Sequence, residues 1–294
     1  MSIGSAKILV ALLALLLATA CSPLTPVNLL VPDDTYTLMA DQPYGENERQ
    51  KLDVYMPLEG AAEAPVVVFF YGGSWRSGNR ADYAFVGEAL ASRGIITVVA
   101  DYRVYPEVTY PAFVEDSAAA TAWVRRQQDS WQTKRQPMFV MGHSAGAYNA
   151  AMLALDERWL SEHGMNAQEI AGWIGLSGPY EFLPIINPDV KPIFHHPDTP
   201  ETSQPFYHAG PQSPPALLMA ATPDKLVDPQ RNTGQLTEKL RSAGVDVETH
   251  YYESLHHVTI IVVMADPLQW WEPVVDQVHD FVMRHSRASS EPDS

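Results

Sequence analysis

The sequence predicts an α/β fold, with a mostly parallel central sheet of about eight strands that is flanked by helices. Short apolar runs alternate along the chain with longer segments of helical periodicity, as they do in proteins built around parallel sheets. The apolar runs at 64–73, 95–102 and 138–144 are continuous, which is typical of strands buried on both faces. Two helical segments end in Gly94 and Gly244, where a glycine C-cap is common.

The expected elements follow one another from residue 35 onward. Two short alternating runs, 35–40 and 51–56, are expected to pair as antiparallel strands around a turn. Further strands are expected at 64–73, 95–102, 138–144, 171–178, 215–222 and 245–252. Helices are expected at 81–94, 110–131, 145–155, 229–244 and 267–286. In the last helix, we expect Trp270 and Trp271 to pack in the core rather than to face a partner.

The first 21 residues are expected to lie outside this fold. Lys7, an apolar run over 8–17 and a set of small residues together form the layout of a secretory signal peptide, residues 1–21. Cys21, the single cysteine of the chain, follows the small residues in a pattern that resembles a bacterial lipobox. We therefore expect an exported lipoprotein that faces the periplasm and is held on the membrane surface by acyl chains on Cys21. The alternatives are ordinary cleaved secretion and an uncleaved anchor.

The rest of the chain divides into a tether, one domain and a tail. Residues 22–34 contain three prolines and are expected to be a tether, and residues 288–294 a disordered tail. The domain, 35–287, is interrupted at 178–215, which holds ten of the 24 prolines. Because long loops in compact domains are usually functional, we expect a cap over the site; a proline-stiffened surface excursion is the alternative.

The net charge limits the classes of partner. At pH 7 the formal charge of the 294-residue chain is −16. Nucleic-acid binding requires clustered Lys and Arg that neutralise phosphates. A nucleic-acid partner is therefore not expected.

The strand expected at 138–144 ends in the sequence Gly142-His143-Ser144-Ala145-Gly146 and leads into a helix. A serine between two glycines at such a junction is the pattern of a nucleophile elbow. The glycines suit a turn so tight that side chains beside the serine would clash. We interpret Ser144 as a catalytic nucleophile, and the alternative is a structural turn.

A nucleophilic serine requires donors for the oxyanion that forms when it attacks a carbonyl. The elbow itself supplies the Ala145 N–H. A second donor is expected from the loop after an earlier strand, where the sequence reads FFYGGSW. The N–H groups of Gly73 and Ser74 are the candidates, and a plain glycine turn is the alternative.

The partner acid is expected after the serine in the chain. Asp224 comes directly after the strand at 215–222, where the geometry is fixed. Asp228 is the rival, but it precedes Pro229 and could instead cap the next helix. We favour Asp224.

The base is expected after the last strand, where His256 and His257 stand side by side. Neighbouring loop residues point in different directions, so that one of the two can face Ser144. His250 lies inside the expected strand, and His143, although adjacent to Ser144, is not expected to be the base. The chain order of serine, acid and histidine differs from the orders of the chymotrypsin-like and subtilisin-like enzymes.

Five segments together resemble the α/β-hydrolase carboxylesterases, specifically the bacterial esterase group related to hormone-sensitive lipase, kynurenine formamidase and feruloyl-esterase-like domains. They are LDVYMP, YGGSW, DYRVYPE, GHSAG and DKLVDPQRNT, and the resemblance covers about residues 40–285. Aligned with the family motifs, the acid falls on Asp224 and the base on His257. Tyr71 stands where the family has a histidine before its two glycines, and His256 where a glycine is common.

The resemblance implies an α/β-hydrolase fold and hydrolysis of short to medium acyl or aryl esters by a Ser144–His257–Asp224 triad, without metal, nucleotide or other cofactor. The sequence shows no Cys/His metal spacing, and His195–His196 alone is a weak ligand pair. Amide hydrolysis, as in an arylformamidase or peptidase, is the alternative on the same fold. A non-catalytic binding module on the membrane surface is an alternative of another class, and it predicts an incomplete triad.

Overall fold

The computed structural model describes residues 24–132 and 134–288. The signal peptide and Cys21 predicted from the sequence therefore lie outside the described residues, as does the predicted C-terminal tail except its first residue, Ala288, which ends a helix. No helix of the described part is long and apolar enough to cross a membrane.

A single eight-stranded sheet forms the centre of the domain, in the order β1-β2-β4-β3-β5-β6-β7-β8. Its strands are β1 (Tyr36–Pro43), β2 (Lys51–Pro57), β3 (Val66–Phe70), β4 (Ile96–Ala100), β5 (Met138–His143), β6 (Ile170–Leu176), β7 (Ala216–Ala221) and β8 (Val247–Tyr252). β2 pairs antiparallel with both β1 and β4, and every other pair is parallel. The predicted sheet of about eight mostly parallel strands, with a leading antiparallel pair, is confirmed.

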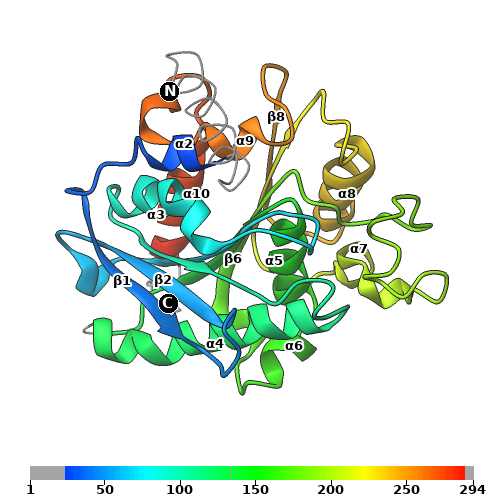
Figure 1. Cartoon of the computed structure of the whole chain (residues 1–294), viewed down its shortest axis with the longest axis horizontal. Helices are drawn as coiled ribbons and strands as arrows, with labels where there is room; N and C mark the ends of the chain where they lie inside the picture. Colours follow the sequence, from blue (N-terminus) through cyan, green and yellow to red (C-terminus); the bar gives the residue numbers. More distant parts are fainter. Residues whose placement is uncertain (1–23, 133, 289–294) are drawn as a thin grey trace, which may run out of the picture.

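Helices cover both faces of the sheet (Figure 1). They are α2 (Thr25–Asn28), α3 (Ala84–Ala91), α4 (Ala112–Trp131), α5 (Ala145–Leu155), α6 (Arg158–Ser161), α7 (Pro205–His208), α8 (Gln235–Ser242), α9 (Thr259–Val262) and α10 (Val274–Ala288), with short 3₁₀ or π turns between them. α3 packs on α10, whereas α4, α5 and α6 pack on one another. The central strands β3, β4 and β5 are therefore buried along their whole length, as their continuous apolar sequences predict.

The predicted packing of the paired tryptophans is wrong. Trp270 is 81% exposed and Trp271 is 40% exposed, and the last helix begins only at Val274. Pro273 precedes that helix, and a proline disfavours helical backbone in the residue before it and removes a donor. The two tryptophans are thus excluded from the helix, whose buried side starts with Val274.

The described part of the segment expected as a tether lies against the domain. Leu24 is buried, and α2 follows it directly. The Asn28 side chain donates to the carbonyl of Ala81 at 2.7 Å and accepts from the N–H of Phe85 at 3.4 Å. From Leu24 to Asn28 the segment is thus held beside α3, whereas Leu29 and Leu30, which follow, are 81% and 57% exposed.

Candidate active site

Ser144 lies in the tight turn between β5 and α5, with φ 53° and ψ −122°. Such a backbone is strained for a residue with a side chain, and the N–H of Ser144 is held by the Leu176 carbonyl at 2.9 Å. A Cβ on Gly146 would lie 2.0 Å from the Phe70 carbonyl oxygen, and one on Gly142 would lie 2.1 Å from the oxygen of Gly146. The two glycines are therefore required by close backbone approach, as the motif predicts.

The structure brings Ser144, His257 and Asp224 together from the ends of three strands. His257 Nε2 lies 2.8 Å from Ser144 Oγ, and His257 Nδ1 lies 2.6 Å from Asp224 Oδ2. Both distances are within hydrogen-bond range. With Nδ1–H donating to the carboxylate, Nε2 is free to accept the serine proton, which is the arrangement of a nucleophile, a base and an orienting acid.

Asp224 is held as a carboxylate by three donors. Its Oδ2 faces His257, and its Oδ1 accepts the backbone N–H groups of Leu226 at 2.8 Å and Val227 at 3.1 Å. Burial by itself would raise the pKa of Asp224, but the hydrogen bond and charge of His257 and the two backbone donors lower it below its usual value. The charged form is thus the stable one at neutral pH.

The alternatives considered for acid and base have other roles in the structure. Asp228 Oδ1 accepts the backbone N–H groups of Gln230 and Arg231, both at 2.9 Å. His256 is exposed, and its backbone N–H donates to Thr259 Oγ1. His250 Nδ1 lies 3.3 Å from Gln277 Nε2.

His143 is buried directly behind the site. Its Nε2 lies 2.7 Å from the carbonyl oxygen of His257, so this nitrogen carries the proton and donates it. Burial, and next the neighbouring His257, lower the pKa of His143 to about 3. A neutral His143 therefore ties the backbone of His257 to the elbow, a contact that the sequence does not reveal because the two residues are 114 positions apart.

The loop after β3 passes close to the elbow. A Cβ on Gly72 would lie 3.0 Å from both Ser144 Cβ and His143 Nδ1. Ser74 and Ala145 line the same cavity as Ser144, and Gly73 precedes Ser74. The three predicted oxyanion donors thus belong to the two segments that meet at Ser144.

The cavity in front of Ser144 has a volume of about 320 Å³. Much of its wall comes from 178–215, the segment expected to form a cap, through Phe182, Ile185 and Val190. Sequence reasoning missed these wall residues individually, because their positions in the long segment follow no periodic pattern. These three side chains make part of the cavity wall apolar.

One hydrogen-bonding residue fixes the start of that segment. Asn232 Oδ1 accepts the backbone N–H groups of Tyr180 at 2.7 Å and Glu181 at 3.0 Å. Glu181 also forms an ion pair with Arg231 at 2.7 Å. The sequence signal for Asn232 is its place in the segment DKLVDPQRNT, which also carries Asp224.

Side-chain sets that could bind a metal ion are absent from the described residues. Within residues 24–132 and 134–288, no group of three or more His, Cys, Asp or Glu side chains is placed so that it could hold a metal ion. His195, one of the pair noted in the sequence, instead uses Nε2 to contact the Tyr110 carbonyl at 2.7 Å.

A family model and several curated relatives match the sequence of this chain. The BD-FAE family model matches residues 52–240. A probable isoprenylcysteine alpha-carbonyl methylesterase of Oryza sativa subsp. japonica is 32% identical over 148 residues, which are 49% of this chain and 36% of that protein. A kynurenine formamidase of Salmo salar is 32% identical over 145 residues, which are 49% of this chain and 47% of that protein. The chain spans about a third to a half of the length of these curated relatives.

Solved structures show the same architecture. Esterase B from Lactobacillus rhamnosis superimposes with a TM-score of 0.72 at 17% sequence identity, over 97% of this chain and 96% of that one. The fold is therefore the α/β-hydrolase fold.

Proposed function

Because the chain belongs to the BD-FAE family, we propose that it is a serine hydrolase that cleaves carboxylic esters. The observation that carries this proposal is the chain of hydrogen bonds from Ser144 Oγ to His257 Nε2, at 2.8 Å, and from His257 Nδ1 to Asp224 Oδ2, at 2.6 Å. Curated relatives that carry the names of a methylesterase and a formamidase support hydrolysis at an acyl carbonyl.

In the proposed mechanism, His257 Nε2 accepts the hydroxyl proton while Ser144 Oγ attacks the acyl carbonyl carbon. The carbonyl π electrons move to oxygen, and the N–H groups of Ala145 and of Gly73 or Ser74 stabilise the oxyanion. When the tetrahedral intermediate collapses, the C–O bond of the ester breaks and His257 donates its proton to the leaving alcohol. Water then attacks the acyl-Ser144 ester with His257 as base, which releases the acid and restores the serine.

The cavity favours substrates of modest size. A volume of about 320 Å³ lies at the lower end of the range for small-molecule sites, and Phe182, Ile185 and Val190 provide an apolar wall. Esters with short to medium acyl or aryl groups suit a cavity of this volume with these apolar side chains in its wall. Formamide hydrolysis is the second candidate, and the formamidase among the relatives is the observation that favours it.

A substrate screen tests the proposal. Initial rates are measured with p-nitrophenyl esters of increasing acyl length, with formyl-kynurenine and with an aminoacyl anilide. We expect the highest kcat/KM on a short or medium ester, and Ser144→Ala should abolish this turnover while the circular-dichroism spectrum stays unchanged. Turnover retained in Ser144→Ala would refute the mechanism, and preference for formyl-kynurenine would establish the second candidate. A protein with no turnover on any substrate would fit the binding-module alternative instead.

We also propose that the protein is exported and held on a membrane by a lipid on Cys21. The support is the sequence pattern at the end of residues 1–21. Cys21→Ser should move the protein from the membrane fraction to the soluble fraction of cells, and unchanged membrane partition would contradict the proposal.

A further inference from the structure

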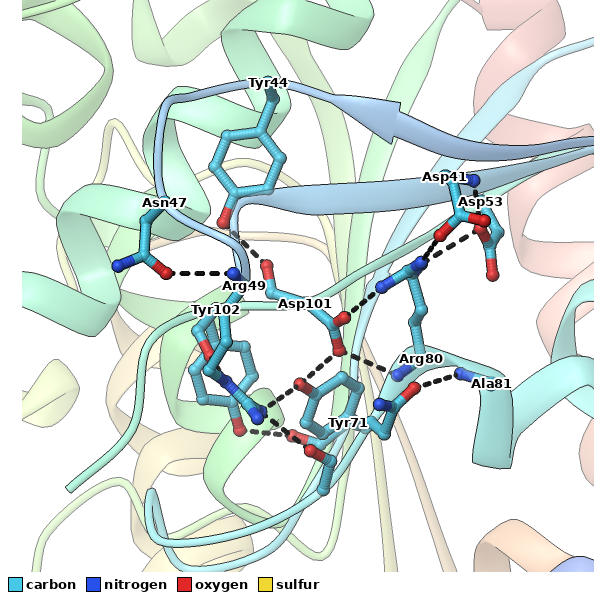
Figure 2. A network of polar contacts seen from close by, with 12 residues as sticks. Asp41, Tyr44, Asn47, Arg49, Asp53, Tyr71, Arg80, Ala81, Asp101 and Tyr102 are labelled. Atoms are coloured by element: carbon cyan, nitrogen blue, oxygen red, sulfur yellow. Dashed lines mark hydrogen bonds and ion pairs between the residues drawn. The ribbon is translucent and has the colours of Figure 1, made fainter. Parts of the chain in front are cut away.

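The loop 72–78, which carries two of the proposed oxyanion donors, is fastened at both ends by one cluster of polar side chains (Figure 2). We call this cluster the loop brace and define it as Arg49, Tyr71, Arg80, Asp101 and Tyr102. Arg49 comes from the turn before β2, whereas Asp101 and Tyr102 follow β4.

At the first end of the loop, Tyr71 is fixed through its hydroxyl and its carbonyl group. Its hydroxyl donates to Asp101 Oδ1 at 2.6 Å, and its carbonyl oxygen accepts from the Tyr102 hydroxyl at 2.7 Å. The two tyrosine rings stack at 4.9 Å. Burial, and next the Asp101 charge, raise the pKa of Tyr71, so its hydroxyl stays protonated and able to donate.

The far end of the loop is held by the same side chains. Asp101 Oδ1 also accepts the backbone N–H of Arg80 at 2.8 Å. Arg49 Nη2 donates to the carbonyl of Gly78 at 2.7 Å and to the Tyr71 hydroxyl at 3.0 Å, so one guanidinium nitrogen connects the two ends. The ends are in contact, since a Cβ on Gly78 would lie 2.5 Å from the Tyr71 ring.

Between its ends the loop has an unfavourable backbone. Gly73, Ser74 and Trp75 have φ values of 126°, 53° and 56°, and left-handed backbone at residues with side chains persists only where the surroundings enforce it. Trp75 Nε1 donates to Asn149 Oδ1 at 3.1 Å and holds the middle of the loop. The brace therefore holds the two ends of a segment that would relax if released.

Burying the charged side chains of the brace costs desolvation free energy, which suggests a role for the cluster beyond packing. Arg80 also pairs with Asp53, at 3.0 Å, and with Asp41 and Asp101. Replacing buried ion pairs by apolar side chains of similar volume is often neutral or stabilising, so stability alone does not account for this arrangement. Tyr71 also stands where the family that the sequence resembles has a histidine, and a histidine has no hydroxyl to donate to Asp101.

We propose that Arg49 and Tyr71 are positioning residues that hold the oxyanion donors of loop 72–78 in reacting geometry. This inference rests on the proposed ester hydrolysis. Donors to an oxyanion act in the transition state and not on the bound ester, so displacing them should lower kcat and leave KM nearly unchanged.

The test compares Arg49→Met and Tyr71→Phe with two control variants. Tyr252→Phe removes the hydroxyl of a buried tyrosine whose hydrogen-bond partners, Gln277 and Met219, lie outside the loop and the brace. Arg125→Met removes a guanidinium that pairs with Glu169 at 2.8 Å, outside the loop. For each variant, kcat is divided by the number of active sites titrated with a fluorophosphonate, and thermal unfolding is recorded.

We expect both brace variants to lose about tenfold or more in kcat per active site, with KM within about twofold of the wild type, because even one oxyanion donor can account for a larger factor. Affinity for a trifluoromethyl ketone, which forms a tetrahedral adduct with the serine, should fall in the same proportion as kcat/KM. Amide hydrogen exchange in 72–78 should be faster in both brace variants. The control variants should change none of these quantities by more than about twofold.

Two results would overturn the inference. If Arg49→Met and Tyr71→Phe unfold at lower temperature but keep kcat per active site, the cluster stabilises the fold and does not position the donors. If the control variants lose kcat equally, the effect is not specific to the loop. Failure of the proposed function is a separate outcome, because it shows as turnover that persists in Ser144→Ala, whatever the brace variants do.

Discussion

Replacing Asp224 by asparagine exchanges one carboxylate oxygen for an NH₂ group without changing the size of the side chain. In the wild type, Oδ1 accepts from the N–H groups of Leu226 and Val227, and Oδ2 accepts from His257 Nδ1. Asparagine has a single acceptor oxygen. The oxygen can satisfy the two backbone donors or the histidine, but not both.

The backbone donors should decide the orientation of the amide. Turning the NH₂ group toward Leu226 and Val227 would leave two donors unpaired, at about 1–3 kcal/mol each. The oxygen of the Asp224→Asn side chain should therefore face the backbone, and its NH₂ group should donate to His257 Nδ1. The ring is then protonated on Nε2, which can no longer accept the Ser144 proton. Loss of the correct tautomer in a serine triad costs about 10⁴ in kcat, or about 5 kcal/mol of transition-state stabilisation.

The assay is the hydrolysis of the best p-nitrophenyl ester by Asp224→Asn and by Asp228→Asn, with unfolding temperatures recorded for both. Asp228→Asn is the matched control, because its carboxylate also accepts two backbone N–H groups but does not contact His257. We expect kcat to fall about 10⁴-fold in the first variant and less than about threefold in the second. Asp224→Asn with more than a tenth of wild-type kcat, in a folded protein, would refute the assignment of the acid and the tautomer argument.

Three further predictions follow from the same geometry. His257→Ala should lose orders of magnitude in kcat. His256→Ala should lose little, because the His256 side chain is exposed. Equal losses of kcat in steady-state kinetics would contradict the choice of base. Gly146→Ala would place a Cβ 2.0 Å from a backbone oxygen and should lower the free energy of unfolding by more than about 3 kcal/mol. The control is Gly94→Ala, where φ is 83° and nothing lies within 4 Å of the added Cβ; it should lower the free energy of unfolding by about 1 kcal/mol. Folding lowers the pKa of His143 from 6.5 to about 3, so that between these pH values the unfolded chain binds a proton that the folded protein does not. The free energy of unfolding should therefore fall as the pH drops from about 6.5 toward 3, by at most about 1.4 kcal/mol per pH unit from this group. Chemical denaturation should show a smaller fall for His143→Gln, and a pH slope identical to that of the wild type would contradict the assignment.

Local patterns in the sequence predict the sheet and the candidate catalytic residues because their signals are contiguous. A buried strand needs an unbroken apolar run, and the elbow needs glycines on both sides of Ser144. The structure joins the residues aligned with the family motifs in one chain of hydrogen bonds, in which His257 contacts Ser144 on one side and Asp224 on the other.

Features that depend on long-range contacts have no comparable signal. Arg49 contacts Tyr71 and Gly78, which lie 22 and 29 positions further along the chain, and no pattern around Arg49 indicates those partners. The error over Trp270 and Trp271 has a local cause, since helical periodicity was extended across Pro273, which in fact marks the start of the helix.

The contacts around His143 connect three segments of the proposed site, namely the elbow, the loop of His257 and the loop after β3. Its backbone belongs to the elbow, its Nε2 holds the carbonyl of His257, and its Nδ1 lies where a side chain on Gly72 would have to fit. In the proposed mechanism an imidazolium forms on His257 during attack, and a protonated His143 would place a second positive charge beside it and oppose proton transfer. The burial that keeps His143 neutral therefore has two effects. It lets the His143 ring pack between the loops, and it leaves Asp224 as the charged side chain that acts on His257.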